Sequence, residues 1–345
     1  MKASPLPIHP PYPVMDAELV RKLPRGPEWQ YEPKWDGFRC LAFREGERVE
    51  LQAKSGKPLA RYFPDVVAML QSVPAPQFVI DSELVIPVEE ELSFEELQLR
   101  LHPAESRVRK LSEAHPATMV AFDLLVDGTG RLLTGTPLRE RREALEAFHA
   151  RFGKDAGRLR LSPATTDLKR ARDWFRRAGS ALDGIVAKRL DFEYRSGDRT
   201  GMVKYKTIRS ADCVVGGFRY LGGKKLVGSL LLGLYGEDGL LHHVGYTSSI
   251  KDEDRGALTK KVEALRQPPG FTGRSPGGPS RWSSERSGEW EPLKPELVVE
   301  VAYDHFTGGR FRHGTKFIRW RPDKAPFQCK FDQVERKSLT NLLDA

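Results

Sequence analysis

The pattern of predicted secondary structure changes near residues 207–212, and this change divides the 345-residue chain into two parts. Before it, short β-branched runs typical of strands alternate with amphipathic runs typical of helices. After it, short strand-like runs dominate, with one charged helical run near 252–266. A chain of this length has room for about two domains that each bury a core. We therefore expect one domain over residues 1–207 and a second over residues 208–345.

The first part is predicted to combine strands and helices. The runs at 78–86 and 118–128 are apolar and β-branched and are followed by turn residues, which indicates strands. Residues 137–153 place a proline near the start, apolar side chains on one face and a glycine at the end, as an amphipathic helix does. A second helix is expected at about 167–178. Residues 1–27 contain seven prolines, and we expect a loosely structured lead-in there.

The second part is predicted to be a small β-barrel. Strand-like runs occur at 212–221, 228–236, 240–248 and 295–306. About five short strands with one inserted helix suit a small, partly open barrel of the OB type. The loop at 268–288 is rich in Gly, Pro and Ser, a composition that favours a connector over a binding element.

The composition limits the class of protein. A hydrophobic fraction of 39% and a charged fraction of 30% are ordinary for a soluble globular protein. The sequence has no apolar run of about 18 residues, and its proline-rich start lacks the apolar core of a signal peptide. Cys40, Cys213 and Cys329 are far apart, which argues against a disulfide framework or a structural zinc site. We expect a soluble, cytoplasmic protein that does not bind membranes.

The charge balance suggests a polyanionic partner. Lys and Arg total 56 against 47 Asp and Glu, for a net charge of +9. Basic side chains that neutralise phosphates release counterions and gain affinity, although a basic solvated surface is the alternative. Residues 311–324 include six basic residues: Arg312, His313, Lys316, Arg319, Arg321 and Lys324. Such a run is typical of a solvated or nucleic-acid-facing surface.

Four segments carry charges in patterns that suggest chemistry. EPKWDGFR, residues 32–39, makes a poor core segment and a poor helix, so we expect a tight turn that presents Lys34; an ordinary surface turn is the alternative. Asp81 and Glu83 share one face of a predicted strand, where carboxylates are costly unless they meet a metal or cation, or unless the face is solvated. LDGIVAKR, residues 182–189, again places an acid and a glycine before an apolar strand that ends in a lysine.

Lys204 and Lys206 alternate with Val203 and Tyr205 in the fourth segment, MVKYKTIR. The two lysines therefore point to the same face of a strand. If they point inward they form a phosphate site, and if they point outward they belong to a basic surface strand.

Together these segments resemble, in order, the motifs of the covalent nucleotidyltransferases, the superfamily of DNA ligases, RNA ligases and mRNA capping enzymes. KWDGFR is similar to motif I, LQAKSGKPL to motif Ia, IDSEL to motif III, VAFDLL to motif IIIa, LDGIVAK to motif IV, VKYK to motif V and RPDK to motif VI. The whole chain resembles the small bacterial ATP-dependent DNA ligases of the ligase C type. The resemblance implies an α+β fold: a nucleotidyltransferase (ATP-grasp-like DNA ligase) domain of antiparallel sheets with flanking helices, followed by an all-β OB-fold domain.

The resemblance implies an ATP-dependent DNA ligase that seals nicks in double-stranded DNA through a lysine-AMP intermediate and a DNA-adenylate. Family analogy adds a role in DNA repair, a place at the bacterial nucleoid and a monomeric state. An RNA ligase or a GTP-dependent capping enzyme would use the same lysine chemistry. A catalytically inactive nucleic-acid-binding module is a further alternative, but it predicts lesions in the motifs, and Lys34, Glu83, Lys204 and Lys206 are all present.

The resemblance also assigns roles to individual residues. The expected catalytic residues are Lys34, Lys204 and Lys206; the expected ATP- and AMP-binding residues are Glu32, Arg39, Lys54, Glu83, Phe122, Lys188, Arg321, Asp323 and Lys324; and the expected ligands of Mg²⁺, or of Mn²⁺ in its place, are Glu83, Asp183 and Asp36. Phe122 is expected to stack on adenine, Glu32 to read the base, and Arg39 with Glu83 to hold the ribose. A free lysine has a pKa of about 10.4, so the Lys34 nucleophile needs activation by neighbouring positive charge.

Two positions depart from the usual motifs. The motif Ia arginine is replaced by Lys54, which loses the planar fork of a guanidinium and leaves a point charge. The motif IV acid is Asp183 instead of glutamate, and its side chain is one methylene shorter. Lys54 and Asp183 are therefore expected to make contacts with ATP and metal that differ in geometry from those of the usual arginine and glutamate.

Overall fold

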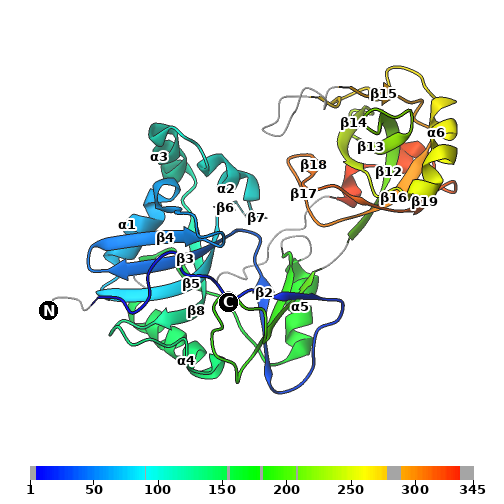
Figure 1. Ribbon diagram of the computed structural model, residues 1–345. Coiled ribbons are helices and arrows are strands. Elements are labelled where there is room, and N and C mark those ends of the chain that lie inside the picture. The colour runs from blue at the N-terminus through cyan, green and yellow to red at the C-terminus, as the bar shows by residue number, and fades with distance from the viewer. Residues whose placement is uncertain are drawn as a thin grey trace. The chain divides into compact units, whose positions relative to one another are not determined.

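The computed structural model describes residues 5–89, 91–153, 156–178, 182–206, 209–277 and 289–334. These residues form two compact units, one ending at Lys206 and the other running from Arg209 to Val334 (Figure 1). Each unit has hydrophobic clusters of its own. Residues 207 and 208, on either side of the expected domain boundary, lie outside the described residues, as do residues 278–288 of the expected loop.

The larger sheet of the first unit has five strands in the order β4-β3-β5-β8-β9. These are β3 (Phe38–Glu45), β4 (Arg48–Ala53), β5 (Gln77–Val85), β8 (Thr118–Val126) and β9 (Leu159–Leu161). All neighbours are antiparallel except β8 and β9. The strands predicted at 78–86 and 118–128 are thus confirmed as β5 and β8, and their apolar side chains join the main core of the unit.

Helices flank this sheet. They are α1 (Pro64–Ser72), α2 (Phe94–Arg100), α3 (Glu105–Ala114) and α4 (Leu138–Phe148), and a short hairpin of β6 (Pro87–Val88) and β7 (Glu91–Leu92) precedes α2. The helix predicted at 137–153 is confirmed as α4, which continues into a π-helical turn at His149–Gly153. Leu138, Leu145 and Phe148 on one face of α4 are buried, as the amphipathic pattern requires.

A smaller four-stranded sheet completes the first unit. Its order is β1-β11-β10-β2, with β1 (Glu18–Val20), β2 (Trp29–Lys34), β10 (Gly184–Arg189) and β11 (Met202–Lys206). Helix α5 (Leu168–Ala178), predicted at 167–178, packs against β2 and β10. Because β10 pairs with both β2 and β11, the segments similar to motifs I, IV and V lie side by side (Figure 1).

The expectation of a loosely structured lead-in over residues 1–27 is wrong for the residues described from 5 onward. Strand β1 pairs in parallel with β11, and Leu6, Val14, Met15 and Ala17 are buried in a cluster of the first unit. Apolar residues lie among the prolines. Their burial gives the segment one ordered conformation, which proline content alone does not indicate.

The second unit is built almost entirely of strands. A sheet in the order β14-β13-β12-β16-β19 contains β12 (Arg209–Tyr220), β13 (Val227–Tyr235), β14 (Leu241–Thr247), β16 (Val298–Tyr303) and β19 (Lys316–Trp320), and β15 (Glu291–Pro292) pairs with β12. The strands β17 (Phe306–Thr307) and β18 (Arg310–Phe311) form a hairpin, and α6 (Arg255–Glu263) packs against β13. Strands with one inserted helix are what the sequence predicts for this part. None of the described helices is long and apolar enough to cross a membrane.

Candidate active site

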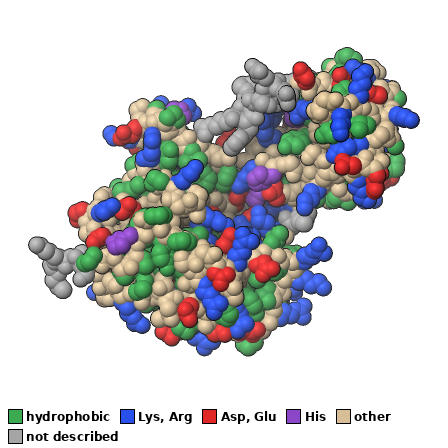
Figure 2. Space-filling view, in the orientation of Figure 1, with side chains coloured by type: hydrophobic (Ala, Val, Ile, Leu, Met, Phe, Trp, Pro, Cys, Tyr) green, Lys and Arg blue, Asp and Glu red, His purple; other side chains and the backbone are tan. Residues whose placement is uncertain are grey.

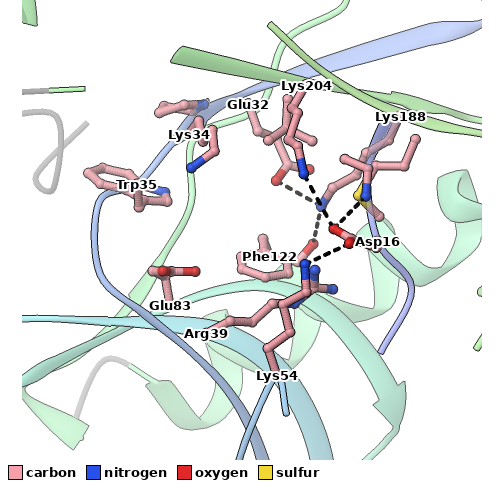
Figure 3. Close-up of a pocket in the computed structure, with 14 residues that line it drawn as sticks. Asp16, Glu32, Lys34, Trp35, Arg39, Lys54, Glu83, Phe122, Lys188 and Lys204 are labelled. Carbon is pink, nitrogen blue, oxygen red and sulfur yellow. Dashed lines mark hydrogen bonds and ion pairs between the residues drawn. The ribbon is translucent and has the colours of Figure 1, made fainter. Parts of the chain in front are cut away.

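A pocket of the first unit collects side chains from both sheets (Figure 3). It is lined by Asp16, Ala17, Glu32, Pro33, Lys34, Trp35, Arg39, Lys54, Glu83, Phe122, Val186, Lys188, Met202 and Lys204. Eight of the residues predicted to act in catalysis or nucleotide binding are in this set. The lining side chains come from segments that are far apart in sequence and that the two sheets bring together.

Lys34 is the last residue of β2, directly before the turn that leads to β3. The turn needs Gly37, because a Cβ atom there would collide with the carbonyl oxygen of Leu84. The Lys34 ammonium forms a close ion pair with Oδ2 of Asp183, and Nζ of Lys206 lies 3.2 Å from the same oxygen. Asp183 thus connects Lys34 to Lys206 at one edge of the pocket, although Asp183 and Lys206 are not among the lining residues.

Glu32 and Lys188 form a buried ion pair. Nζ of Lys188 lies 2.9 Å from Oε2 of Glu32, and the Gln30 amide donates to Oε1 at 2.8 Å. The same ammonium is 4.5 Å from the ring centroid of Phe122, and the Arg39 guanidinium is 5.4 Å from it. The half-buried Phe122 ring therefore faces the pocket with cations of two different strands beside it.

Arg39 is held by a buried network. Its Nε and Nη2 donate to the two carboxylate oxygens of Asp81 at 3.0 and 2.6 Å. The Tyr194 hydroxyl donates to Asp81 at 2.6 Å and accepts from the backbone N–H of Met15 at 3.1 Å. Burial raises the pKa of Tyr194, so the hydroxyl remains a donor. The Asp81 carboxylate thus meets a cation, one of the options that the sequence left open.

Glu83 is the other carboxylate on β5, and its environment is different. Burial raises the pKa of Glu83 to about 7, although the positive charges of Lys34 and Arg39 act in the opposite direction. The negative charge of Asp36, in the turn after Lys34, contributes to the increase. Within the described residues no hydrogen bond to the Glu83 carboxylate is seen, so it is a half-buried acceptor that a cation or a hydroxyl group could satisfy.

Asp16 is a pocket residue that lies outside all of the motif-like segments. Its Oδ2 lies 2.6 Å from Nζ of Lys54, and its Oδ1 lies 3.7 Å from Nζ of Lys204. Burial alone would raise the pKa of Asp16, but hydrogen bonds from Lys54 and the backbone of Ala17, with the charges of the two lysines, lower it to about 2. An acid directly after the apolar pair Val14–Met15 was the only signal in the sequence.

Lys204 is affected by the charges around it. Burial lowers the pKa of Lys204, the ammonium groups of Lys54, Lys34 and Lys206 lower it further, and Asp16 raises it. Positive charge is therefore concentrated at this side of the pocket, which suits an anionic ligand.

The motif VI residues lie in the second unit, near the end of β19. Arg321 donates from Nη1 to both carboxylate oxygens of Asp212 at 2.9 and 3.0 Å, and Nζ of Lys324 lies 2.8 Å from the same carboxylate. Asp323 pairs with Arg321 at 2.8 Å. Asp212 was also absent from the sequence prediction.

Comparison with known proteins identifies the family. Residues 15–206 match the model of the ATP dependent DNA ligase domain, and residues 223–324 match the ATP dependent DNA ligase C terminal region. The chain belongs to the ATP-dependent DNA ligase family. It is 44% identical to DNA ligase C2 of Mycolicibacterium smegmatis, with 96% of each chain covered, and 42% identical to DNA ligase C of Mycobacterium tuberculosis, with 98% of each covered.

A solved structure from a study of minimal Lig E DNA ligases has the same fold. The two chains superpose with a TM-score of 0.56 at 17% identity, over 90% of this chain and 99% of the other. The predicted fold, a nucleotidyltransferase domain followed by an OB-type domain, is confirmed. Family membership also confirms that this chain is a ligase that uses ATP.

Proposed function

We propose that this DNA ligase seals nicks in duplex DNA through AMP bound covalently to Lys34. The observation that carries the proposal is the placement of Lys34: its ammonium group is fixed by Asp183 at the edge of a pocket rich in positive charge. After Nζ has given its proton to the solvent, it would attack the α-phosphorus of ATP, and the bond to pyrophosphate would break, with pyrophosphate as the leaving group. Lys204 and Lys206 would stabilise the negative charge on the phosphate during this step.

In this proposal the pocket residues bind the nucleoside. The Phe122 ring would stack on adenine, and Glu32 with Lys188 would read the edge of the base. Arg39 and Glu83 would hold the ribose, since a guanidinium and a carboxylate together offer donors and acceptors to its hydroxyl groups.

We also propose that Mg²⁺ takes part. Glu83, Asp183 and Asp36 are the carboxylates from which its protein ligands would come. Mg²⁺ is usually bound by one or two carboxylates, with phosphate oxygens and water as the other ligands. A bound Mg²⁺ would supply positive charge against the phosphates of ATP.

The first unit would serve as the adenylation domain, residues 1–207, and the second as the OB-fold domain, residues 208–345. Arg321, Asp323 and Lys324 would act from the second domain on the β- and γ-phosphates. Lys and Arg side chains are scattered over both units in the view of Figure 2, which suits phosphate contacts spread over the whole protein. Binding to nicked duplex should therefore be salt-sensitive and largely independent of sequence.

A role in DNA repair is part of the proposal. The chain is 30% identical over 306 residues to the multifunctional non-homologous end joining DNA repair protein LigD of Mycobacterium tuberculosis, of which the match covers 37%. We propose that the protein acts as a monomer at the bacterial nucleoid.

Incubation with ATP labelled at the α-phosphate, followed by a chase with nicked duplex, tests the proposal. Wild type should become labelled, transfer the label to DNA and produce a sealed strand, whereas Lys34→Ala should do none of these. Label that reaches nicked RNA but not nicked DNA would contradict the DNA substrate. Labelling by GTP and not by ATP would favour a capping-type reaction.

A further inference from the structure

Asp16 reaches the pocket from a segment outside all of the motif-like segments. Its backbone N–H donates to the carbonyl of Asp198 at 2.8 Å, and its neighbours Met15 and Ala17 are buried. The Met15 amide is held by the Tyr194 hydroxyl, and the Ala17 amide donates to Oδ1 of Asp16 itself at 2.8 Å. The Asp16 carboxylate is therefore held by the adjacent backbone as well as by the hydrogen bond from Lys54.

Three cations converge on this carboxylate. Lys54 follows β4 and Lys204 lies on β11, and both point toward Asp16 from different sheets (Figure 3). The Arg199 guanidinium lies 3.9 Å from the carboxylate. Lys54, expected to bind the nucleotide, and Lys204, expected to act in catalysis, thus share one carboxylate.

The other ion pairs at the pocket are more deeply buried. The exposed fraction of the side chain is 5% for Asp183 and 2% for Glu32, against 19% for Asp16. The Lys54 side chain is 52% exposed. Exposed pairs contribute little to stability, so the Asp16 pairs exchange partners more readily than the buried ones.

We propose that Asp16 is a positioning residue that competes with ATP phosphate for Lys54 and Lys204. The inference rests on the proposed function, because that function takes Lys204 as the group that meets the α-phosphate. Asp16 keeps the flexible lysine side chains at the pocket and lowers the net positive charge that ATP encounters. ATP has to displace the carboxylate from the lysines, so Asp16 sets an upper limit on ATP affinity.

The test is the rate of AMP transfer to Lys34 over a range of ATP concentrations, in wild type, Asp16→Asn and Asp16→Glu. Removing the charge in Asp16→Asn should lower KM for ATP about three- to tenfold, with kcat within about twofold. Asp16→Glu keeps the charge and should stay near wild type. The difference in KM should shrink with added KCl, because salt screens exposed charges beyond about 10 Å at 0.1 M.

Glu18→Gln is the matched control, since it removes an exposed carboxylate two residues away that does not line the pocket. Its KM should equal that of wild type. If Asp16→Asn does not fold, Asp16→Ser removes the charge and keeps an acceptor for the Ala17 amide. An unchanged or increased KM in a folded, uncharged variant would overturn the inference.

The two proposals fail in different ways. Absence of label on wild type would contradict the proposed function. Label on wild type, none on Lys34→Ala and equal KM values for wild type and Asp16→Asn would leave that function intact and overturn the role of Asp16 alone.

Discussion

Two aspartates at the pocket each hold two lysines, but in different surroundings. Asp183 contacts Lys34 and Lys206, and its side chain is 5% exposed. It precedes Gly184, whose missing Cβ lets the backbone of β10 approach that of β11, and its backbone N–H donates to the carbonyl of Lys34 at 3.1 Å. Asp183 and Lys34 are thus coupled through both backbone and side chains.

Asp16, by contrast, contacts Lys54 and Lys204 through side chains only, at 2.6 and 3.7 Å. The Lys54 side chain is half exposed. Unlike an arginine, it has no planar guanidinium that could pair with a carboxylate in one orientation. In the proposed mechanism the buried Asp183 would fix the Lys34 nucleophile, whereas the more exposed Asp16 would hold two lysines that ATP has to displace from it. Removing each charge should therefore have opposite effects on the reaction with ATP.

The largest effect is expected for Asp183→Asn. Loss of this charge leaves Lys34 and Lys206 without their shared anion and frees the nucleophile to move, so adenylation should slow about 10- to 100-fold. The rate of AMP labelling at saturating ATP, compared between Asp183→Asn and wild type, measures this decrease. Asp191→Asn is the matched control, because Asp191 forms an exposed pair with Arg189 at the end of β10. If Asp183→Asn and Asp16→Asn changed kcat and KM alike, the distinction between the two sites would be wrong.

A smaller effect, on stability, is expected for Glu83→Gln. Burial raises the pKa of Glu83 from 4.5 to about 7, so the folded protein binds this proton more tightly than the unfolded chain. The contribution of Glu83 to stability is therefore present at low pH and is lost as pH rises through about 7. Glu83→Gln has no such loss and should be more stable than wild type at pH 8 by on the order of 2 kcal/mol.

Urea denaturation at pH 5 and at pH 8 measures this difference, which should be larger at pH 8. A Glu83→Gln protein that is less stable than wild type at pH 8 would show that the carboxylate is well satisfied as an anion. In that case Glu83 would not be an unsatisfied acceptor, and the argument that it is available to bind a cation would fail.

The smallest effect is expected for Tyr194→Phe. This variant removes the hydroxyl that links the Asp81–Arg39 pair to the Met15 amide, beside Asp16. We expect a loss of about 1 kcal/mol of stability and a modest increase in KM for ATP, since Arg39 keeps its ion pair with Asp81. Thermal melting and adenylation kinetics check both. No change in either would show that the network does not position the pocket residues.

The sequence predicted the parts of the site that depend on local pattern. The alternation of Lys204 and Lys206 with apolar residues, and the turn after Lys34, follow from strand geometry and from Asp-Gly chemistry over a few residues. The family resemblance then assigned the motif-like segments to one nucleotide site, which periodicity alone could not do.

The missed residues depend on contacts between distant segments. Asp16 meets Lys204, and Tyr194 meets Asp81, only after the two sheets have formed. Asp212 likewise meets Arg321 only when β12 lies beside the segment after β19. The ordered conformation of the segment that carries Asp16 could not be predicted from its proline content. It depends on the burial of its apolar residues against distant parts of the chain.

The position of AMP on the chain tests the central claim most directly. Protein incubated with ATP and Mg²⁺ is digested at alkaline pH, which preserves a phosphoramidate bond, and the peptides are sequenced by mass spectrometry. We predict AMP on Lys34 and on no other lysine, with the modification lost on addition of nicked duplex DNA. AMP on Lys204, Lys206 or Lys54, or no AMP on any peptide, would contradict the assignment of Lys34 as the nucleophile.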